Sequence, residues 1–321
     1  TDEILQVLWA NYHFNEPFSI FRRVTLFSNQ YNLFDFGGVH ILSGINVGAF
    51  SQFTNLWDAS FHFDTDSEMI RNTFLRGGPS MKLPGGANAA LSVGTNSRKK
   101  LSFEVEGMMH KGRENSSSRY GIEFDVTYKP ISNISISLDP VFSVQQSQLQ
   151  YVSQEQPGSE TRYIFGSIDR KTFSMSLRLD LILTPELTIQ FWGQPFIASG
   201  DYSEFKHITD SHGDNFTDRF RTYAPAEISY DDASDSYSVT ETASGLSYGF
   251  GNPDFNLKEF LSNLVFRWEY RPGSYIYLVW PQSRSATDPS GQFQFRDDFS
   301  GIWDIYPRDV VLLKVSYRIG R

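Results

Sequence analysis

Residues 173–183 read FSMSLRLDLIL, and this stretch decides the class of fold. Apolar side chains at Phe173, Met175, Leu177, Leu179 and Leu181 alternate with polar ones at Ser174, Ser176, Arg178 and Asp180. Strict alternation is typical of a β-strand whose two faces meet different surroundings. Alternation resumes at Leu187 after the turn Thr184-Pro185-Glu186, so the chain passes from one such strand into the next.

The same two-residue period recurs along the chain and predicts an all-β protein. We expect about fourteen strands, at 4–14, 19–34, 39–51, 55–64, 71–82, 87–96, 99–112, 117–130, 133–151, 161–184, 187–200, 257–271, 274–284 and 308–319. An even number suits a closed antiparallel barrel with both termini on the periplasmic side. The expectation is a single domain over residues 1–321 with about 14 strands, within a range of 12–16.

The composition excludes several classes of protein. The 321 residues include no cysteine, which excludes disulfide scaffolds and thiol chemistry. Aromatic residues make up 16% of the chain, whereas disordered chains are poor in them. The net charge of −9 argues against a nucleic-acid partner, because binding phosphates requires a basic surface. The longest apolar run, Tyr275 to Trp280, is far shorter than the ~20 residues of a transmembrane helix.

Alternation alone fits two architectures. A soluble sandwich or barrel turns its apolar face inward, whereas a membrane barrel turns that face toward lipid. Long segments such as 161–184, and aromatic residues such as Tyr128 and Trp268 near strand ends, favour a transmembrane β-barrel. Short turns also alternate with long polar connections. The long connections, at roughly 203–256 and 285–307, are predicted to be extracellular loops.

Five segments carry a family resemblance: FLRGGPSM at 74–81, GTNSRK at 94–99, QPFIASGDY at 194–202, FRWEYRPGSYIYLVW at 266–280 and LLKVSYRI at 312–319. Together they resemble the C-terminal outer-membrane β-barrel domain of an uncharacterised Gram-negative family, a domain of unknown function, over roughly 70–321. Full-length members of that family carry an N-terminal carbohydrate-binding-like sandwich ahead of the barrel. The resemblance implies a barrel in the outer membrane of a Gram-negative bacterium, and it brings no catalytic motif to transfer.

Three sets of residues are candidates for function. Arg76, Gly77, Gly78 and Pro79 interrupt a predicted strand and are a candidate pore or plug element. Charged residues on the polar strand faces are the candidate lining of the lumen: Glu104, Glu106, Glu123, Asp125, Arg178, Asp180, Arg267, Glu269, Lys314 and Arg318. Aromatic residues in the acidic long connection are candidate contacts for a partner or a sugar: Phe205, Phe216, Phe220, Tyr223, Tyr230, Tyr237 and Tyr248.

These features predict an outer-membrane channel, or a barrel that assists transport, for a polar solute or polymer, with a glycan as one candidate. Two alternatives stay open: a plugged barrel that anchors or scaffolds a partner protein, and a barrel-resident hydrolase. The sequence contains no motif for catalysis, a metal site or a cofactor, so we expect none of these. The expected partners are outer-membrane lipid, a protein at the external or periplasmic face, and a glycan.

Overall fold

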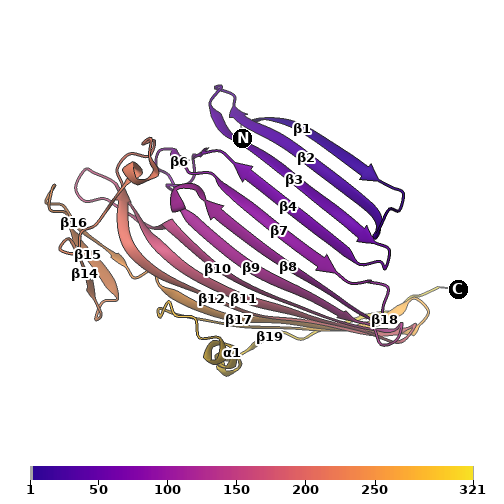
Figure 1. Ribbon diagram of the computed structural model, residues 1–321. Coiled ribbons are helices and arrows are strands. Elements are labelled where there is room, and N and C mark those ends of the chain that lie inside the picture. The colour runs from indigo at the N-terminus through magenta and orange to yellow at the C-terminus, as the bar shows by residue number, and fades with distance from the viewer. Residues whose placement is uncertain (1–2, 321) are drawn as a thin grey trace.

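Long β-strands dominate the computed structural model, which describes residues 3–320 (Figure 1). Most of them form one antiparallel sheet. Its long strands are β1 (Glu3–Phe14), β2 (Phe21–Asp35), β3 (His40–Phe53), β4 (Asp58–Asp66), β7 (Gly86–Gly94), β8 (Leu101–Gly112), β9 (Ser117–Tyr128), β10 (Ile134–Glu155), β11 (Arg162–Thr184), β12 (Leu187–Ile208), β17 (Phe255–Arg271) and β18 (Ser274–Asp288). The all-β class and the antiparallel pairing predicted from alternation are confirmed.

The strands of the large sheet pair in their order along the chain. The last position, beside β18, is shared by two short strands, β19 (Arg308–Asp309) and β20 (Leu312–Ser316). The connections at 129–133, 185–186 and 272–273 lie at one end of the sheet, and the long connections 209–254 and 289–307 lie at the other (Figure 1). β12 continues to Ile208, so the longest connection begins six residues later than the predicted 203.

One predicted strand, at 71–82, is wrong. The chain there forms a loop between β4 and β7 that contains only a small hairpin, β5 (Met69–Arg71) and β6 (Met81–Leu83). Arg76 and Gly77 adopt left-handed backbone angles, with φ of 49° and 112°, and Pro79 offers no N–H to a neighbouring strand. These three residues prevent continuous pairing, although the flanking residues have an apolar pattern.

Because residues 71–82 add no strand to the large sheet, the relative direction of its first and last strands differs from the prediction. The path from β1 to β19 contains thirteen strands, and neighbours along it are antiparallel. The two edge strands therefore run in the same direction: β1 begins at the end with the long connections, and β20 ends at the opposite one. The predicted even count with both termini at one end is wrong for the described residues. Within residues 3–320, β1 pairs only with β2, and the sheet is not closed.

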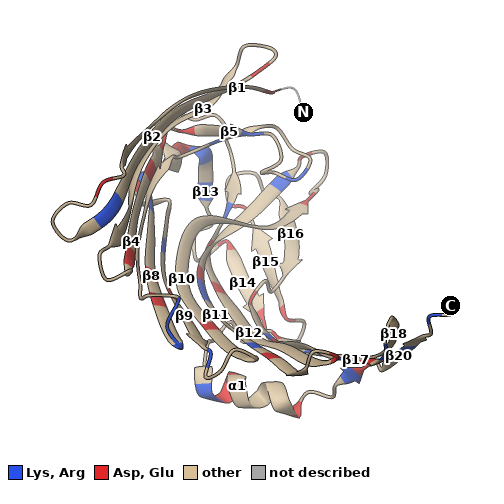
Figure 2. Cartoon of the chain, turned by 90° about the vertical axis from the view of Figure 1, so that its right-hand side faces the viewer, with Lys and Arg blue, Asp and Glu red and all other residues tan. Residues whose placement is uncertain are grey.

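The sheet curves into an arc with two chemically different faces (Figure 2). Residues paired across neighbouring antiparallel strands share a face. Glu104 pairs with Asp125, and Glu106 pairs with Glu123, while Phe103 pairs with Val126 on the opposite face. The registers extend this separation through β12, β17 and β18. We call the face with Glu104 and Asp125 the inner face, and the face with Phe103 and Val126 the outer face.

A short helix, α1 (Phe295–Asp304), covers part of the outer face and identifies it as the convex side of the arc (Figure 2). Ile302 is fully buried against Ile197 of β12 and Phe260 of β17. The carboxylate of Asp298 accepts hydrogen bonds from the Asn256 side chain at 2.9 Å and from the backbone N–H of Gln294 at 2.7 Å. The apolar contacts of Ile302 and the buried carboxylate of Asp298 both fix the helix to the sheet. No helix in the described part of the chain is long and apolar enough to cross a membrane.

Ile302→Ala should detach α1 from the sheet. Truncating a fully buried isoleucine costs about 2–5 kcal/mol, and a ten-residue helix has little stability of its own. We expect limited proteolysis to cleave the connection 289–307 faster in this variant. The matched control is Ser300→Ala on the exposed side of the same helix, which should be cut at the wild-type rate. Equal cleavage of the two variants would contradict the packing described here.

Candidate functional site: the inner face and its cap

Hydrogen bonds between polar side chains join β3, β4, β7, β8 and β9 across the inner face. The side-chain N–H of Asn88 donates to Asp64 at 2.7 Å, and the side-chain oxygen of Asn88 lies 2.8 Å from His110 Nδ1. His110 Nε2 lies 3.0 Å from the Ser117 hydroxyl, and Asn46 contacts His62 at 3.1 Å. A face that satisfies polar groups with one another and with solvent suits a water-filled space.

Nine of the ten candidate lumen charges share the inner face according to the strand registers. They are Glu104, Glu106, Glu123, Asp125, Arg178, Asp180, Arg267, Glu269 and Lys314. Arg318 lies beyond the end of β20, where its backbone N–H donates to Ser274 at 3.0 Å. Within residues 3–320, none of the ten forms an ion pair; Arg267 and Lys314 instead lie over the rings of Tyr275 and Tyr277. The carboxylates of Glu104, Glu106 and Glu123 therefore stay available to the space that they face.

The carboxylates are not spread evenly over this face. Glu104, Glu106, Glu123 and Asp125 occupy directly paired positions on β8 and β9. The register of β9 with β10 brings Asp139 opposite Asp125. The described residues contain no group of three or more such side chains arranged to hold a metal ion. The cluster is a negatively charged area of wall, and it would attract cations by its field.

The Arg76–Pro79 segment lies against β10 and β11, near the end of the sheet with the long connections. The guanidinium of Arg76 lies 4.1 Å from the centre of the Tyr151 ring on β10. A Cβ at Gly78 would come within 2.5 Å of the Tyr163 ring, so a larger residue would have to displace that ring. Neighbouring Leu75 and Met81 are fully buried against Phe165. The segment is thus a turn that fastens the 67–85 loop to β10 and β11.

A small folded unit, which we call the cap, stands at the end with the long connections. It consists of β13 (Phe220–Thr222), which pairs with β12, and the three-stranded sheet β14 (Ile228–Asp231), β15 (Ser236–Thr240) and β16 (Ser247–Gly251). Figure 1 shows β14–β16 beyond the ends of most strands, and Figure 2 shows them within the outline of the arc. The cap therefore lies over the mouth of the curved sheet.

Aromatic side chains pack the cap against the sheet. Phe205 and Tyr223 are buried with Ile164, Val239 and Phe250 between β11, β12 and the cap. Phe216 is buried in a second cluster, beside Phe220, against the 67–85 loop. Tyr237 and Tyr248 are partly buried around the first cluster, and Tyr230 is 43% exposed. Most of the seven candidate aromatic residues thus form the interior of the cap.

A buried carboxylate joins the cap to β11. Glu241, only 3% exposed, receives two hydrogen bonds from the guanidinium of Arg162, at 2.7 and 3.1 Å. The hydroxyls of Ser244 and Tyr248 donate to the same carboxylate at 2.6 and 2.7 Å. The Arg162 contact holds the pKa of Glu241 well below its usual range. Such a fully satisfied charge fixes one geometry, because removing either partner leaves the other buried without compensation.

Two neighbouring groups in the cap have shifted pKa values. The backbone N–H groups of Ala224 and Thr242, with the guanidinium of Arg221, lower the pKa of Glu227 to about 2. Burial lowers the pKa of His207 to about 4, although Glu241 opposes this effect. His207 Nδ1 lies 3.9 Å from Glu241 and has no hydrogen-bond partner. His207 is therefore a neutral buried base at pH 7.

Sequence reasoning missed the residues that hold the cap and the loop together. Besides Arg162 and Glu241, Arg219 is fully buried and donates to Glu68 at 2.7 Å and to the backbone oxygens of Lys82 and Gly213. The pairs Arg162–Glu241, Arg219–Glu68 and Arg219–Lys82 join residues that are far apart along the chain. A charged residue in a polar connection is normally solvated, so nothing in the local sequence distinguished them.

The fold defines a class: a large, open, antiparallel β-protein with a polar concave face and a folded cap. The chain belongs to the family described as domain of unknown function DUF5916, whose model matches residues 1–320. A family of unknown function is consistent with the resemblance to an uncharacterised family that the sequence suggested. No curated protein matches the sequence.

The cap should loosen as the pH falls from 7 to 5. The unfolded chain protonates its histidine near pH 6.5, whereas His207 in the folded cap stays neutral down to about pH 4. Stability contributed by the neutral buried ring is therefore lost as pH falls through this window, by at most about 2 kcal/mol at pH 5. We expect amide protection in β14–β16, corrected for intrinsic exchange, to fall roughly tenfold.

His207→Gln should abolish that pH dependence, because glutamine does not titrate. His212→Gln is the control, since His212 is exposed and its ring lies 2.8 Å from the Ser80 hydroxyl. Hydrogen exchange of the three proteins at pH 7 and pH 5 makes the comparison. If the His207 variant loses protection as the wild type does, His207 is not the responsible group.

Proposed function

We propose that this chain forms most of the wall of an outer-membrane β-barrel through which a polar solute passes. One observation carries the proposal: the apolar face of the sheet is the exposed convex face, and the polar face is concave. A soluble barrel has the opposite arrangement, because its interior must exclude water. A membrane barrel requires apolar side chains toward lipid and polar ones toward the lumen.

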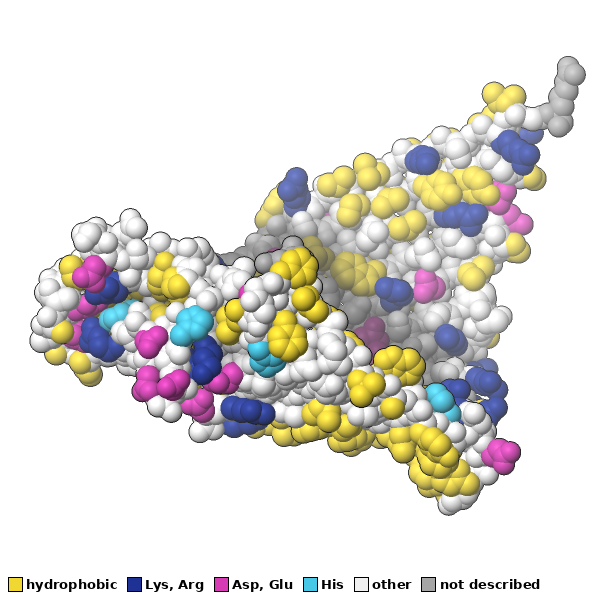
Figure 3. All heavy atoms as spheres, turned by 90° about the horizontal axis from the view of Figure 1, so that it is seen from above, with side chains coloured by type: hydrophobic (Ala, Val, Ile, Leu, Met, Phe, Trp, Pro, Cys, Tyr) yellow, Lys and Arg dark blue, Asp and Glu magenta, His cyan; other side chains and the backbone are white. Residues whose placement is uncertain are grey.

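The exposure of the outer face supports a lipid environment. Phe61, Leu91, Leu101 and Tyr128 are 44%, 57%, 59% and 45% exposed. They belong to several different strands, so they form a broad apolar surface rather than a local patch. Monomeric soluble proteins rarely expose such a continuous surface. In Figure 3, charged and histidine side chains gather at one end of the molecule, and broad areas of hydrophobic side chains, with single charges among them, cover the strands.

Closure of the wall follows from the direction of its edges. β1 and β20 run the same way, so an all-antiparallel barrel needs an odd number of further strands between them. Those strands would come from outside residues 3–320. Both faces of β1 carry exposed apolar residues, including Leu5, Val7 and Trp9 on the inner side at 62%, 48% and 66%. We expect the strands that close the barrel to cover this inner patch as well as the open edge of β1.

The chemistry of the inner face suggests what passes. The unpaired carboxylates on β8 and β9 would favour cations and neutral polar molecules over anions. The cap, held by Glu241 and Arg162, would restrict the opening at the end with the long connections. A glycan belongs to the neutral polar class.

Conductance across planar bilayers tests the proposal with the full natural protein. We expect ion conductance with a preference for cations, measured as a reversal potential in a salt gradient. The combined change Glu104→Gln, Glu123→Gln and Asp125→Asn should reduce that preference because it removes three charges from one area of wall. Asp232→Asn in the exposed part of the cap is the control and should leave the preference unchanged. Folded, inserted protein without conductance would favour the plugged anchoring barrel instead.

A further inference from the structure

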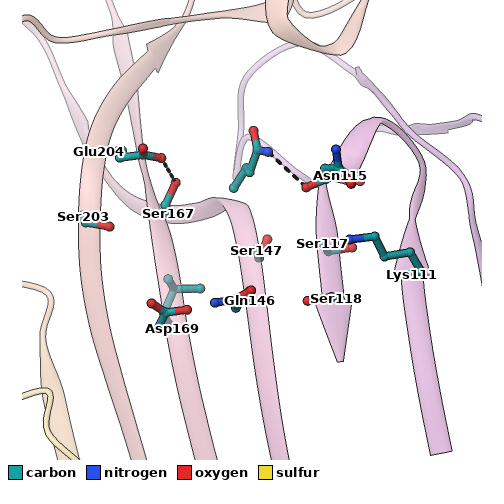
Figure 4. Close-up of a pocket in the computed structure, with 13 residues that line it drawn as sticks. Lys111, Asn115, Ser117, Ser118, Gln146, Ser147, Ser167, Asp169, Ser203 and Glu204 are labelled. Carbon is teal, nitrogen blue, oxygen red and sulfur yellow. Dashed lines mark hydrogen bonds between the residues drawn. The ribbon is translucent and has the colours of Figure 1, made fainter. Parts of the chain in front are cut away.

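A polar groove crosses the outer face just above its apolar surface. One part of it has a volume of about 360 Å³ and is lined by side chains from β8 to β12 (Figure 4). A second part of about 230 Å³ shares Ser118, Gln146 and Asp169 with the first and adds Tyr120. The shared residues make the two parts one continuous groove.

The strand registers explain why the groove is polar. Lys111, Ser118, Gln146, Asp169 and Asp201 are directly paired in sequence from β8 to β12, so they form one row on the outer face. In the next row toward the middle of the strands, Tyr120 pairs with Met109 and Val144. The outer face therefore changes from apolar to polar between these two rows.

Irregular backbone opens the groove at its upper side. The pairing of β10 with β11 shifts after Ser147, and that of β11 with β12 shifts beside Glu204. Glu204 and Asn115 adopt left-handed angles, with φ of 46° and 55°. β-bulges bend a strand and redirect side chains. The Glu204 carboxylate accepts a hydrogen bond from Ser167 at 2.8 Å, and the Gln148 amide donates to the backbone oxygen of Asn115 at 3.0 Å (Figure 4).

The groove offers the groups that recognise a sugar. Serine hydroxyls and glutamine amides both donate and accept, and carboxylates accept from pairs of hydroxyls. Tyr120, 51% exposed at the edge of the groove, presents a ring face on which the apolar side of a pyranose can stack. Lys111 is the one cation of the row, against the carboxylates of Asp169 and Asp201, and Glu204 adds a third carboxylate to the groove, so these charges favour a neutral sugar over an anionic one.

We infer that this groove is a saccharide-binding site, with Tyr120 stacking on one sugar ring and Gln146 and Asp169 hydrogen-bonding its hydroxyls. The site lies on the outside of the wall and is independent of conduction through the lumen. Its ligand has two sources of the same chemistry, the sugars of a membrane glycolipid and a free oligosaccharide. The border position beside the apolar surface favours the glycolipid, and that preference rests on the membrane location proposed above.

The test measures binding of two probes to the full protein in detergent. One probe is purified lipopolysaccharide, and the other is the polysaccharide released from it by mild acid. We expect both to bind, the intact glycolipid more tightly. Tyr120→Ala and Asp169→Asn should each weaken binding of both probes at least tenfold. The matched controls are Tyr128→Ala, an exposed tyrosine at the other end of β9, and Asp297→Asn on α1, which should bind as the wild type does.

Conductance of the same variants separates this inference from the proposed function. Tyr120→Ala should conduct as the wild type does while it loses saccharide binding. Tighter binding of the free polysaccharide would keep the site and overturn the glycolipid as its source. The inference is overturned if neither probe binds the wild type, or if the Tyr120 and Asp169 variants bind as tightly as the controls.

Discussion

The structure depends on one constraint, the two-residue period of a β-strand kept in phase across neighbouring strands. Because paired residues share a face, one register assigns every side chain to the concave or the convex side. A slip of one residue between β8 and β9 would move Glu104 and Asp125 to the convex side and Phe103 and Val126 to the concave side. The inner wall, the apolar surface and the polar row of the groove all follow from this agreement between strands.

The register shared by neighbouring strands also explains where the sheet stops being regular. At the end with the long connections, β10, β11 and β12 extend beyond their neighbours. Their side chains there must be covered by packing outside the regular wall. Buried aromatic clusters and the Arg162–Glu241 pair provide this on the side of the cap, and the 67–85 loop covers the other side. Bulges at the base of these extensions form the polar groove. The irregular features therefore gather at one end, where the strands leave the repeating wall.

Alternation predicted most of the fold because it is a local property of the sequence. Thirteen of the expected strands are present in the sheet, and Glu104 and Arg178 lie on the same face of it. The error at 71–82 arose because backbone angles at Arg76 and Gly77 overrode an apolar pattern. The Arg162–Glu241 contact joins residues 79 positions apart, and the groove depends on bulges; neither leaves a local signal.

Spin labels at single cysteines introduced along β9 test the central claim most directly, since the native chain contains no cysteine. Labels at 122, 124 and 126 lie on the outer face, and labels at 123, 125 and 127 lie on the inner face. In lipid bilayers, collision with oxygen should be high at the even positions, and collision with a water-soluble nickel complex should be high at the odd ones. Loss of this alternation, or alternation in the opposite phase, would contradict a wall with lipid outside and water inside.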